Sequence, residues 1–521
     1  MPLNTTYRQL LRHSGTYFLG SVISRAASVL LLPVYTHYLA PEDYGCLAIL
    51  DLTAALVAIV AHGAMPQAVN RQHFAAADER ERDAVWWTGV TAVALLGILV
   101  LAPAWALRGP LAAMALGDSH PEGANLLLLV FPTLWLGAIS GLLEVYLRVQ
   151  KWSIGYVATS FVRLAVNATL NVTFLAAGLG VLGVLIANLV TGALYAAALL
   201  VIFVLTRGPY SFLPSVCWRL LKFGGPLVGT GLIAMLLHQV DRFFLRMYCP
   251  FADVGRYSLA YQFGFGINAI LLVPFGSIWN VLQFEVASQR DANTVYHTVF
   301  TYFTRVLTVV MVGISLFAVP IVHALAGDRF SQAAGLVPVV CLAYYFFSFT
   351  TFTNLPASLS QRTGRLLPGS LAALCFNVTA NNFFIPRYGV AAAPWVAVGT
   401  FLLLCVINYV ACRGLCGVSF PYSRALFAAS PGVTLYLAHS SLFSPDDSLA
   451  YYGLGCFGWL VYALVLFRRP LRMAISFRPR RQASGSAGCQ RYLDDGDQGA
   501  GQRPTPTDSH ETSPQFDIAR S

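Results

Sequence analysis

Apolar runs long enough to cross a bilayer recur along most of the chain, from Tyr17 to Phe467. A membrane-spanning helix needs about 20 consecutive apolar residues, because each residue of a helix rises about 1.5 Å. The chain is therefore predicted to be an all-α polytopic membrane protein with about 14 transmembrane helices. The predicted helices are 16–36, 45–70, 84–107, 125–147, 154–177, 181–205, 224–247, 255–283, 298–320, 335–356, 366–385, 390–410, 424–442 and 450–467.

Basic residues in the connecting segments orient this set of helices. Fifteen lysines and arginines lie in the loops on the side of the N-terminus, before the C-terminal tail is counted. Cytoplasmic loops carry the excess of basic residues in membrane proteins, so both termini are expected in the cytoplasm. The loops of the other side hold only Arg108, Arg246, Arg256, Arg329 and Arg387.

The two halves of the sequence resemble each other at an offset of 210 residues. Asp43 and Gly45 match Asp253 and Gly255, and further matches precede and follow this pair. Six predicted helices separate the two starts, so both copies have the same orientation in the membrane. Parallel repeats of this kind place a transporter's substrate site between the halves. We expect two parallel-repeat six-helix lobes around a central cavity, at 1–210 and 211–412. Two additional C-terminal helices are expected at 413–470, and a basic, then disordered, cytoplasmic tail at 471–521.

Composition agrees with a membrane transporter and argues against other classes. Hydrophobic residues make up 57% of the chain and charged residues 11%, with a mean hydropathy of +0.63. The net charge of +10 is spread between the apolar runs, which argues against a nucleic-acid partner. Cys412 and Cys416 are the only close cysteine pair and lack the second half of a zinc site, so no metal site is expected. The sequence also lacks the usual nucleotide-binding and hydrolase motifs, so neither enzymatic activity nor a bound cofactor is expected.

Arginines inside the predicted helices are candidate binding residues. A charge in a membrane span is costly and usually faces a cavity or a partner. Arg25 and Arg163 lie near the middle of their helices, whereas Arg305 is shallower and can equally extend towards the headgroups. A guanidinium group binds phosphate oxygens in bidentate fashion, so these three arginines are candidates for binding a pyrophosphate.

Asparagines form a polar stripe that both halves share. Arg163, Asn167 and Asn171 follow one another at intervals of four residues, and Asn377 and Asn381 repeat the lower part of the stripe. These asparagines are candidate polar residues of the cavity. The alternative is that they form hydrogen bonds between neighbouring helices.

Acidic and titratable residues in the predicted helices are candidates for ion coupling. Asp51 is a candidate for binding a cation. His238 and Asp241 lie within about one helical turn of Arg242 and form either a proton-coupling site or a structural ion pair. Transport is expected to use a proton or sodium gradient rather than a cofactor. Glu144 is expected to pair with Arg148, four residues further on.

Two motifs carry a resemblance to a known family. Residues 31–45 read LLPVYTHYLAPEDYG, and residues 146–151 read YLRVQK, followed by Tyr156. Both resemble the Wzx-type polysaccharide transporters, flippases of the multidrug/oligosaccharidyl-lipid/polysaccharide (MOP) superfamily. The resemblance covers about residues 1–410. It implies two six-helix bundles facing a cavity, in a bacterial inner membrane, that transfer an undecaprenyl-pyrophosphate-linked oligosaccharide to the outer leaflet.

The resemblance also sets the expected partners and the alternatives. Besides the lipid-linked oligosaccharide and membrane lipids, a polysaccharide polymerase and a chain-length regulator are expected partners. A cation-coupled multidrug exporter and a lipid II flippase would share the fold. A membrane scaffold that recruits polysaccharide enzymes without transporting anything is a fourth hypothesis, which intact export from cavity mutants would favour.

Overall fold

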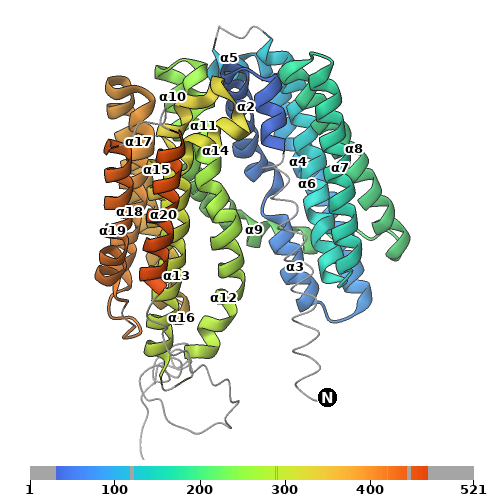
Figure 1. Ribbon diagram of the computed structural model, residues 1–521. Helices are drawn as coiled ribbons and strands as arrows, with labels where there is room; N and C mark the ends of the chain where they lie inside the picture. Colours follow the sequence, from blue (N-terminus) through green and yellow to red (C-terminus); the bar gives the residue numbers. More distant parts are fainter. Residues whose placement is uncertain are drawn as a thin grey trace, which may run out of the picture.

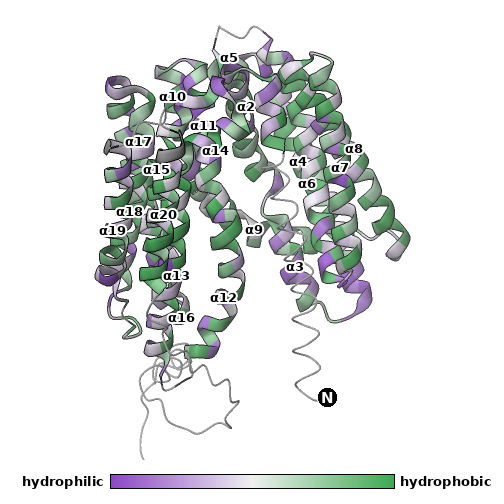
Figure 2. Cartoon of the chain, in the orientation of Figure 1, coloured by the Kyte–Doolittle hydropathy of each residue, from purple (hydrophilic) through white to green (hydrophobic). Residues whose placement is uncertain are grey.

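The computed structural model describes residues 31–117, 122–287, 289, 291–418, 420–442 and 448–467. Across these residues the regular structure consists of helices, with no strand. Apolar residues cover the middle of the helices, while polar residues gather towards their ends (Figure 2). This distribution is typical of a protein surrounded by lipid, where every backbone polar group must be bonded within the protein.

The first half of the described chain begins with a helical segment at residues 31–38. The helices that follow are α2 (Pro41–His62), α3 (Met65–Ala75), α4 (Glu79–Ala106), α5 (Arg108–Leu116), α6 (Gly123–Val149), α7 (Ser153–Ala176) and α8 (Gly180–Thr206).

The second half begins with α9 (Pro214–Gln239), α10 (Asp241–Tyr248) and α11 (Phe251–Ile267). It continues with η1 (Asn268–Leu272), α12 (Val273–Ala287), α13 (Ala292–Leu316), α14 (Ala318–Ala326), η2 (Asp328–Gly335), α15 (Val337–Thr353), α16 (Leu355–Leu359), η3 (Thr363–Leu366), α17 (Leu367–Tyr388), η4 (Gly389–Ala391) and α18 (Ala392–Cys412). The last two helices are α19 (Tyr422–Leu442) and α20 (Ser448–Phe467).

Eight helical stretches of the described chain are long and apolar enough to cross a membrane. A ninth results if Asp328–Gly335 and Val337–Leu359, which are bent by 47° relative to each other, form one span. The prediction of an all-α polytopic membrane protein is therefore confirmed. The count of fourteen stays a prediction, as do the domain boundaries and the central cavity.

Three predicted helices are interrupted. Residues 45–70 divide into α2 and α3 because Gly63 and Ala64 adopt left-handed conformations, with φ of 57° and 53°. Residues 224–247 divide at Val240, between α9 and α10. Within 255–283 the chain passes through the π-helical turn η1, which joins α11 to α12. These breaks lie inside apolar runs, where the hydrophobic pattern carries no signal for them.

Two groups of helices follow from the packing (Figure 1). In the first lobe, α6 packs against α4 and α8, and α7 packs against α8. In the second lobe, α15 packs against α11, α13 and α18, and α17 packs against α18. The helix α9 contacts both groups, because it packs against α2, α3 and α4 of the first lobe and against α17 of the second.

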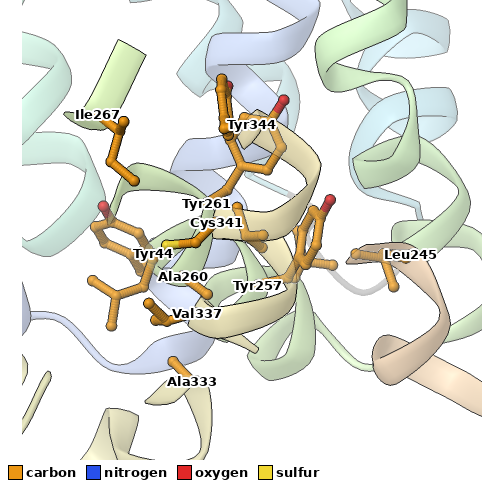
Figure 3. Packing of buried hydrophobic residues seen from close by; sticks show 14 of the residues in the cluster. Tyr44, Leu245, Tyr257, Ala260, Tyr261, Ile267, Ala333, Val337, Cys341 and Tyr344 are labelled. Carbon is orange, nitrogen blue, oxygen red and sulfur yellow. The ribbon is translucent and has the colours of Figure 1, made fainter. Parts of the chain in front are cut away.

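One hydrophobic cluster extends across the junction of the lobes. It contains Tyr44 of α2 together with Tyr261 of α11 and Tyr344 of α15. Figure 3 shows this packing, with Tyr44 among side chains of the second lobe that include Val337. The two lobes are therefore joined by a shared core around Tyr44, near the N-terminal end of α2.

The C-terminal hairpin of α19 and α20 packs on α13. The indole Nε1 of Trp459 donates a hydrogen bond to the carbonyl oxygen of Val309 at 2.9 Å. Within the hairpin, the hydroxyl of Tyr462 donates to the carbonyl oxygen of Ala428 at 2.9 Å. The first bond attaches the hairpin to the second lobe, and the second joins its two helices to each other.

Candidate functional site

Arg163 lies on α7 and forms an ion pair with Glu144 of α6. Its Nη1 is 3.2 Å from Oε1 of Glu144, and its guanidinium lies 4.8 Å from the ring centroid of Tyr195 on α8. The hydroxyl of Tyr195 donates to the same carboxylate oxygen at 3.1 Å. Glu144 was expected to pair with Arg148, whose guanidinium instead lies over the ring of Tyr156. Three helices of the first lobe therefore meet at one polar cluster, Arg163, Glu144 and Tyr195.

The direction of Arg163 distinguishes this residue from one that extends to the lipid headgroups. Its side chain is 49% exposed. Ile154 and Val172 are exposed on the same helix, each nine residues away, which places them on the opposite side of α7 from Arg163. The contacts with Glu144 and Tyr195 show that Arg163 points towards α6 and α8. An arginine that is half exposed on its protein-facing side retains free donor capacity for an anion.

Arg305 is the one of the other two candidate arginines that the structure describes. Arg25 lies outside the described residues. Arg305 lies on α13 and is partly buried, and its Nη1 is a buried donor that has no hydrogen-bond partner among the described residues. The structure does not bring Arg305 into contact with the cluster around Arg163.

The asparagines form equivalent interhelical ladders in the two lobes. In the first lobe, Nδ2 of Asn167 donates to Asn188 of α8 at 3.0 Å, and Nδ2 of Asn171 donates to the side chain of Asn167 at 3.1 Å. Asn171 is fully buried. The bond to Asn188 crosses from α7 to α8, as the interhelical alternative expects, while the bond between Asn171 and Asn167 lies within α7.

The second lobe repeats the ladder between α17 and α18. Asn377 donates to the hydroxyl of Thr400 at 3.0 Å, and Asn381 donates to Asn377 at 2.7 Å. In the first lobe the matching threonine is Thr191 of α8, which also accepts from Asn167, at 3.5 Å. Asn377 and Asn381 are both buried; the bond from Asn377 to Thr400 joins α17 to α18, and Asn381 supports Asn377 from the same helix. A role for the four asparagines in a cavity stays a prediction.

Asp241 and Arg242 form a buried ion pair at the junction of α9 and α10. The Nη1 of Arg242 is 3.8 Å from Oδ1 of Asp241, and the two side chains are 8% and 5% exposed. The hydroxyl of Tyr257 donates to Oδ2 of Asp241, and Nε of Arg242 is 3.3 Å from the hydroxyl of Ser258. Each charge therefore has an opposite charge and a hydroxyl partner, which is the arrangement a structural ion pair requires.

His238 lies close to this pair in an aromatic environment. Its Nδ1 is 3.3 Å from the hydroxyl of Tyr261, and its ring makes an edge contact with Phe347 at 4.6 Å between centroids. The carbonyl oxygen of His238 is 3.5 Å from Nη1 of Arg242. The three residues that the sequence placed within one turn are thus brought together, with Tyr261 as an additional partner.

Asp51 lies on the side of α2 that faces the second lobe. It follows Tyr44 by seven residues, which is close to two helical turns, and Tyr44 accepts a hydrogen bond from Gln262 of α11 at 2.6 Å. Asp51 is exposed, and its carboxylate forms no hydrogen bond or ion pair with another described residue. Arg242 of the second lobe is among the charges that act on it. Asp51 is therefore an accessible acidic group between the lobes.

Several residues of these clusters were not singled out from the sequence. The charged and polar groups of these clusters are bound by Tyr195, Tyr257, Tyr261 and Gln262. Tyrosine is frequent along the chain, so the spacing of the three tyrosines carries no signal. Among the described residues, no group of three or more histidines, cysteines, aspartates or glutamates is placed to bind a metal ion.

The family of the chain follows from its first half. A family model of polysaccharide biosynthesis proteins matches residues 10–279, which include both motifs and the Arg163 cluster. The chain belongs to the polysaccharide biosynthesis protein family. It is a multi-pass membrane protein whose fold is that of solved membrane transporters and flippases. No curated protein sequence matches this member of the family.

Solved structures of three transporters share the fold of this polysaccharide biosynthesis protein. The inward closed conformation of the lipid II flippase MurJ has a TM-score of 0.70 at 13% identity, covering 88% of this chain and 99% of the flippase. An inward-facing multidrug resistance MATE transporter has a TM-score of 0.57 at 14% identity, with 75% and 97% covered. A Vibrio cholerae MATE transporter has a TM-score of 0.52 at 14% identity, with 79% and 97% covered.

Proposed function

We propose that this protein flips an undecaprenyl-pyrophosphate-linked oligosaccharide from the cytoplasmic to the periplasmic leaflet, for O-antigen, capsule or exopolysaccharide synthesis. The observation that carries the proposal is the match of residues 10–279 to polysaccharide biosynthesis proteins. The two-lobed transporter fold supports translocation rather than sugar chemistry. Consistent with this, the sequence contains no motif for nucleotide hydrolysis.

The mechanism is alternating access between two lobes. The described contacts between the lobes include a shared core around Tyr44, which lies near the start of α2. The glycan and its pyrophosphate enter from the cytoplasmic side while the prenyl chain stays in lipid. Arg163, with Arg25 and Arg305, binds the pyrophosphate, since guanidinium groups hold phosphate oxygens at any physiological pH. The lobes then rock to expose the glycan to the other side.

An ion gradient supplies the driving force in this proposal. Asp51 is an accessible acidic group between the lobes, while Asp241 and His238 lie next to the buried charge of Arg242. A proton or a sodium ion that binds these groups changes the balance of charge between the lobes. The same proposal places both termini in the cytoplasm and the protein in the inner membrane. A polysaccharide polymerase and a chain-length regulator are its partners there.

A clean deletion strain tests the proposed function. Surface polysaccharide and undecaprenyl-linked intermediates are measured together, with a plasmid-borne copy as the control. The proposal predicts loss of surface polymer and accumulation of intermediates on the cytoplasmic leaflet, both reversed by the plasmid. Normal polymer with normal intermediates, in a strain without a second flippase, would contradict it.

A cation-coupled drug exporter is the second candidate, and Asp51 is the observation that favours it. An accessible carboxylate between the lobes attracts cationic compounds, whereas a pyrophosphate is repelled by it. Sensitivity of the same deletion strain to cationic drugs, with unchanged surface polymer, would favour the exporter. A lipid II flippase is distinguished by viability, because its loss stops cell-wall synthesis.

A further inference from the structure

The helices α2 and α11 cross at two glycines with their backbones in direct contact. A Cβ atom placed on Gly45 would lie 3.0 Å from the backbone nitrogen of Gly255, and closer still to the carbonyl oxygen of Phe251. A Cβ atom placed on Gly255 would lie 3.1 Å from the backbone nitrogen of Gly45, and closer still to the carbonyl oxygen of Pro41. No larger residue fits either position unless the helices move apart.

The crossing is symmetric with respect to the internal repeat. Gly255 is the repeat partner of Gly45 at the offset of 210 residues, and Phe251 stands at the same offset from Pro41. Each glycine therefore meets the residue that starts the partner helix. Such reciprocal contacts arise where a two-fold axis passes through an interface. The crossing lies on the pseudo-symmetry axis that relates the two lobes.

Further contacts between the lobes surround the crossing. The hydroxyl of Thr36 donates to the carbonyl oxygen of Leu325 at 2.8 Å, and Gln262 donates to Tyr44 at 2.6 Å. The guanidinium of Arg246 donates to the carbonyl oxygen of Leu116, the last residue of α5. These three contacts are hydrogen bonds without a partner carboxylate. They can break when the lobes separate without leaving two opposite charges unpaired.

Exposed residues lie on α2 and α11 beyond the crossing. Asp51, six residues after Gly45, and Gln262, seven residues after Gly255, are both exposed. Phe265 of α11 is 48% exposed. The two helices are thus in close contact near their N-termini, and their later turns carry exposed positions.

We propose that the Gly45–Gly255 crossing is a gate, closed by backbone contact at this end of the lobes, that opens when the lobes rock. Glycine at both positions lets the helices approach until the surrounding hydrogen bonds form. A side chain at either position holds the helices apart and shifts the equilibrium towards the state in which this end is open. The proposal concerns the conformational equilibrium and is independent of which substrate the protein carries.

A distance measurement across the gate tests the proposal. Spin labels are attached to cysteines at Met114 of α5 and Tyr388 of α17, which are 83% and 67% exposed, after replacement of the native cysteines. The full chain in lipid nanodiscs is compared with Gly45→Ala and Gly255→Ala. We expect a single, shorter distance population in the parent and a growing longer-distance population in each glycine variant.

Gly266→Ala is the matched control. Gly266 lies on α11, and a Cβ atom there would have nothing within 4 Å. Alanine has a higher helix propensity than glycine at each of these positions, so only the crossing distinguishes them. The control should retain the parent's distance distribution.

Unchanged distances in both gate variants would overturn the proposal. So would the loss of folded protein in both gate variants with an intact Gly266→Ala control, because the crossing would then be required for folding rather than for gating.

Discussion

Replacing Arg163 separates a substrate-binding arginine from one that only stabilises the fold. Its ion pair with Glu144 has an N–O distance of 3.2 Å, with side chains 49% and 21% exposed. The bare Coulomb attraction is about 5 kcal/mol at an effective dielectric constant of about 20. Solvent screening and side-chain entropy reduce partly exposed pairs to about 0.2–1 kcal/mol. Breaking the pair should therefore lower the free energy of unfolding by less than about 1 kcal/mol.

The expected effect on transport is larger. A hydrogen bond to a charged group contributes about 1.5–3 kcal/mol, so losing one such bond to pyrophosphate lowers substrate affinity roughly 10- to 150-fold. Arg163→Ala should reduce polysaccharide export at least about tenfold, while the amount of folded protein stays the same. Export by Arg163→Lys should lie between that of the parent and that of Arg163→Ala, because lysine keeps the charge but loses the bidentate geometry.

Glu144→Gln is the control that decides the interpretation. It breaks the same ion pair but leaves the guanidinium free for the substrate. Export should stay at or above the parent level, measured as surface polymer in the complemented deletion strain, with protein levels and thermal unfolding measured alongside. If Glu144→Gln and Arg163→Ala lower export and thermal stability to the same extent, the ion pair is structural and Arg163 does not bind the substrate.

Four further substitutions test other parts of the structure. Asp241→Asn leaves Arg242 buried without its partner, and should cost about 3–5 kcal/mol and most of the folded protein, as measured by fluorescence-detected size exclusion. Asp51→Asn should fold normally but lose the dependence of export on the ion gradient, which ionophores would reveal. Asn377→Ala should lower stability by about 0.6–1.7 kcal/mol in thermal unfolding, without a specific transport defect. Trp459→Phe should cost about 1 kcal/mol, seen as faster proteolysis of the C-terminal hairpin.

The sequence predicted the positions of the helices because each requires a long apolar run. It also predicted the polar ladder of Asn377 and Asn381, since an interval of four residues places both on one side of a helix. The repeat offset relates Gly45 to Gly255, but only the structure shows that the two glycines touch each other.

The partners of the charged residues are the part that sequence reasoning missed. Glu144 was paired with Arg148 on the basis of helical spacing alone, yet its ion pair is with Arg163 on the next helix. Contacts between helices depend on their rotation and crossing, which the apolar pattern does not specify. In the same way, the hydrogen bond between Tyr257 and Asp241 depends on how α10 packs against α11.

Reconstituted translocation is the measurement that tests the central claim most directly. The purified protein is placed in liposomes whose undecaprenyl-pyrophosphate-linked oligosaccharide is initially on one leaflet, and a membrane-impermeant glycosidase reports its appearance on the other. The account predicts transfer that depends on the protein and on an imposed ion gradient, with little transfer by Arg163→Ala. Transfer no faster than in protein-free liposomes, for the lipid-linked glycan made by the same cell, would contradict it.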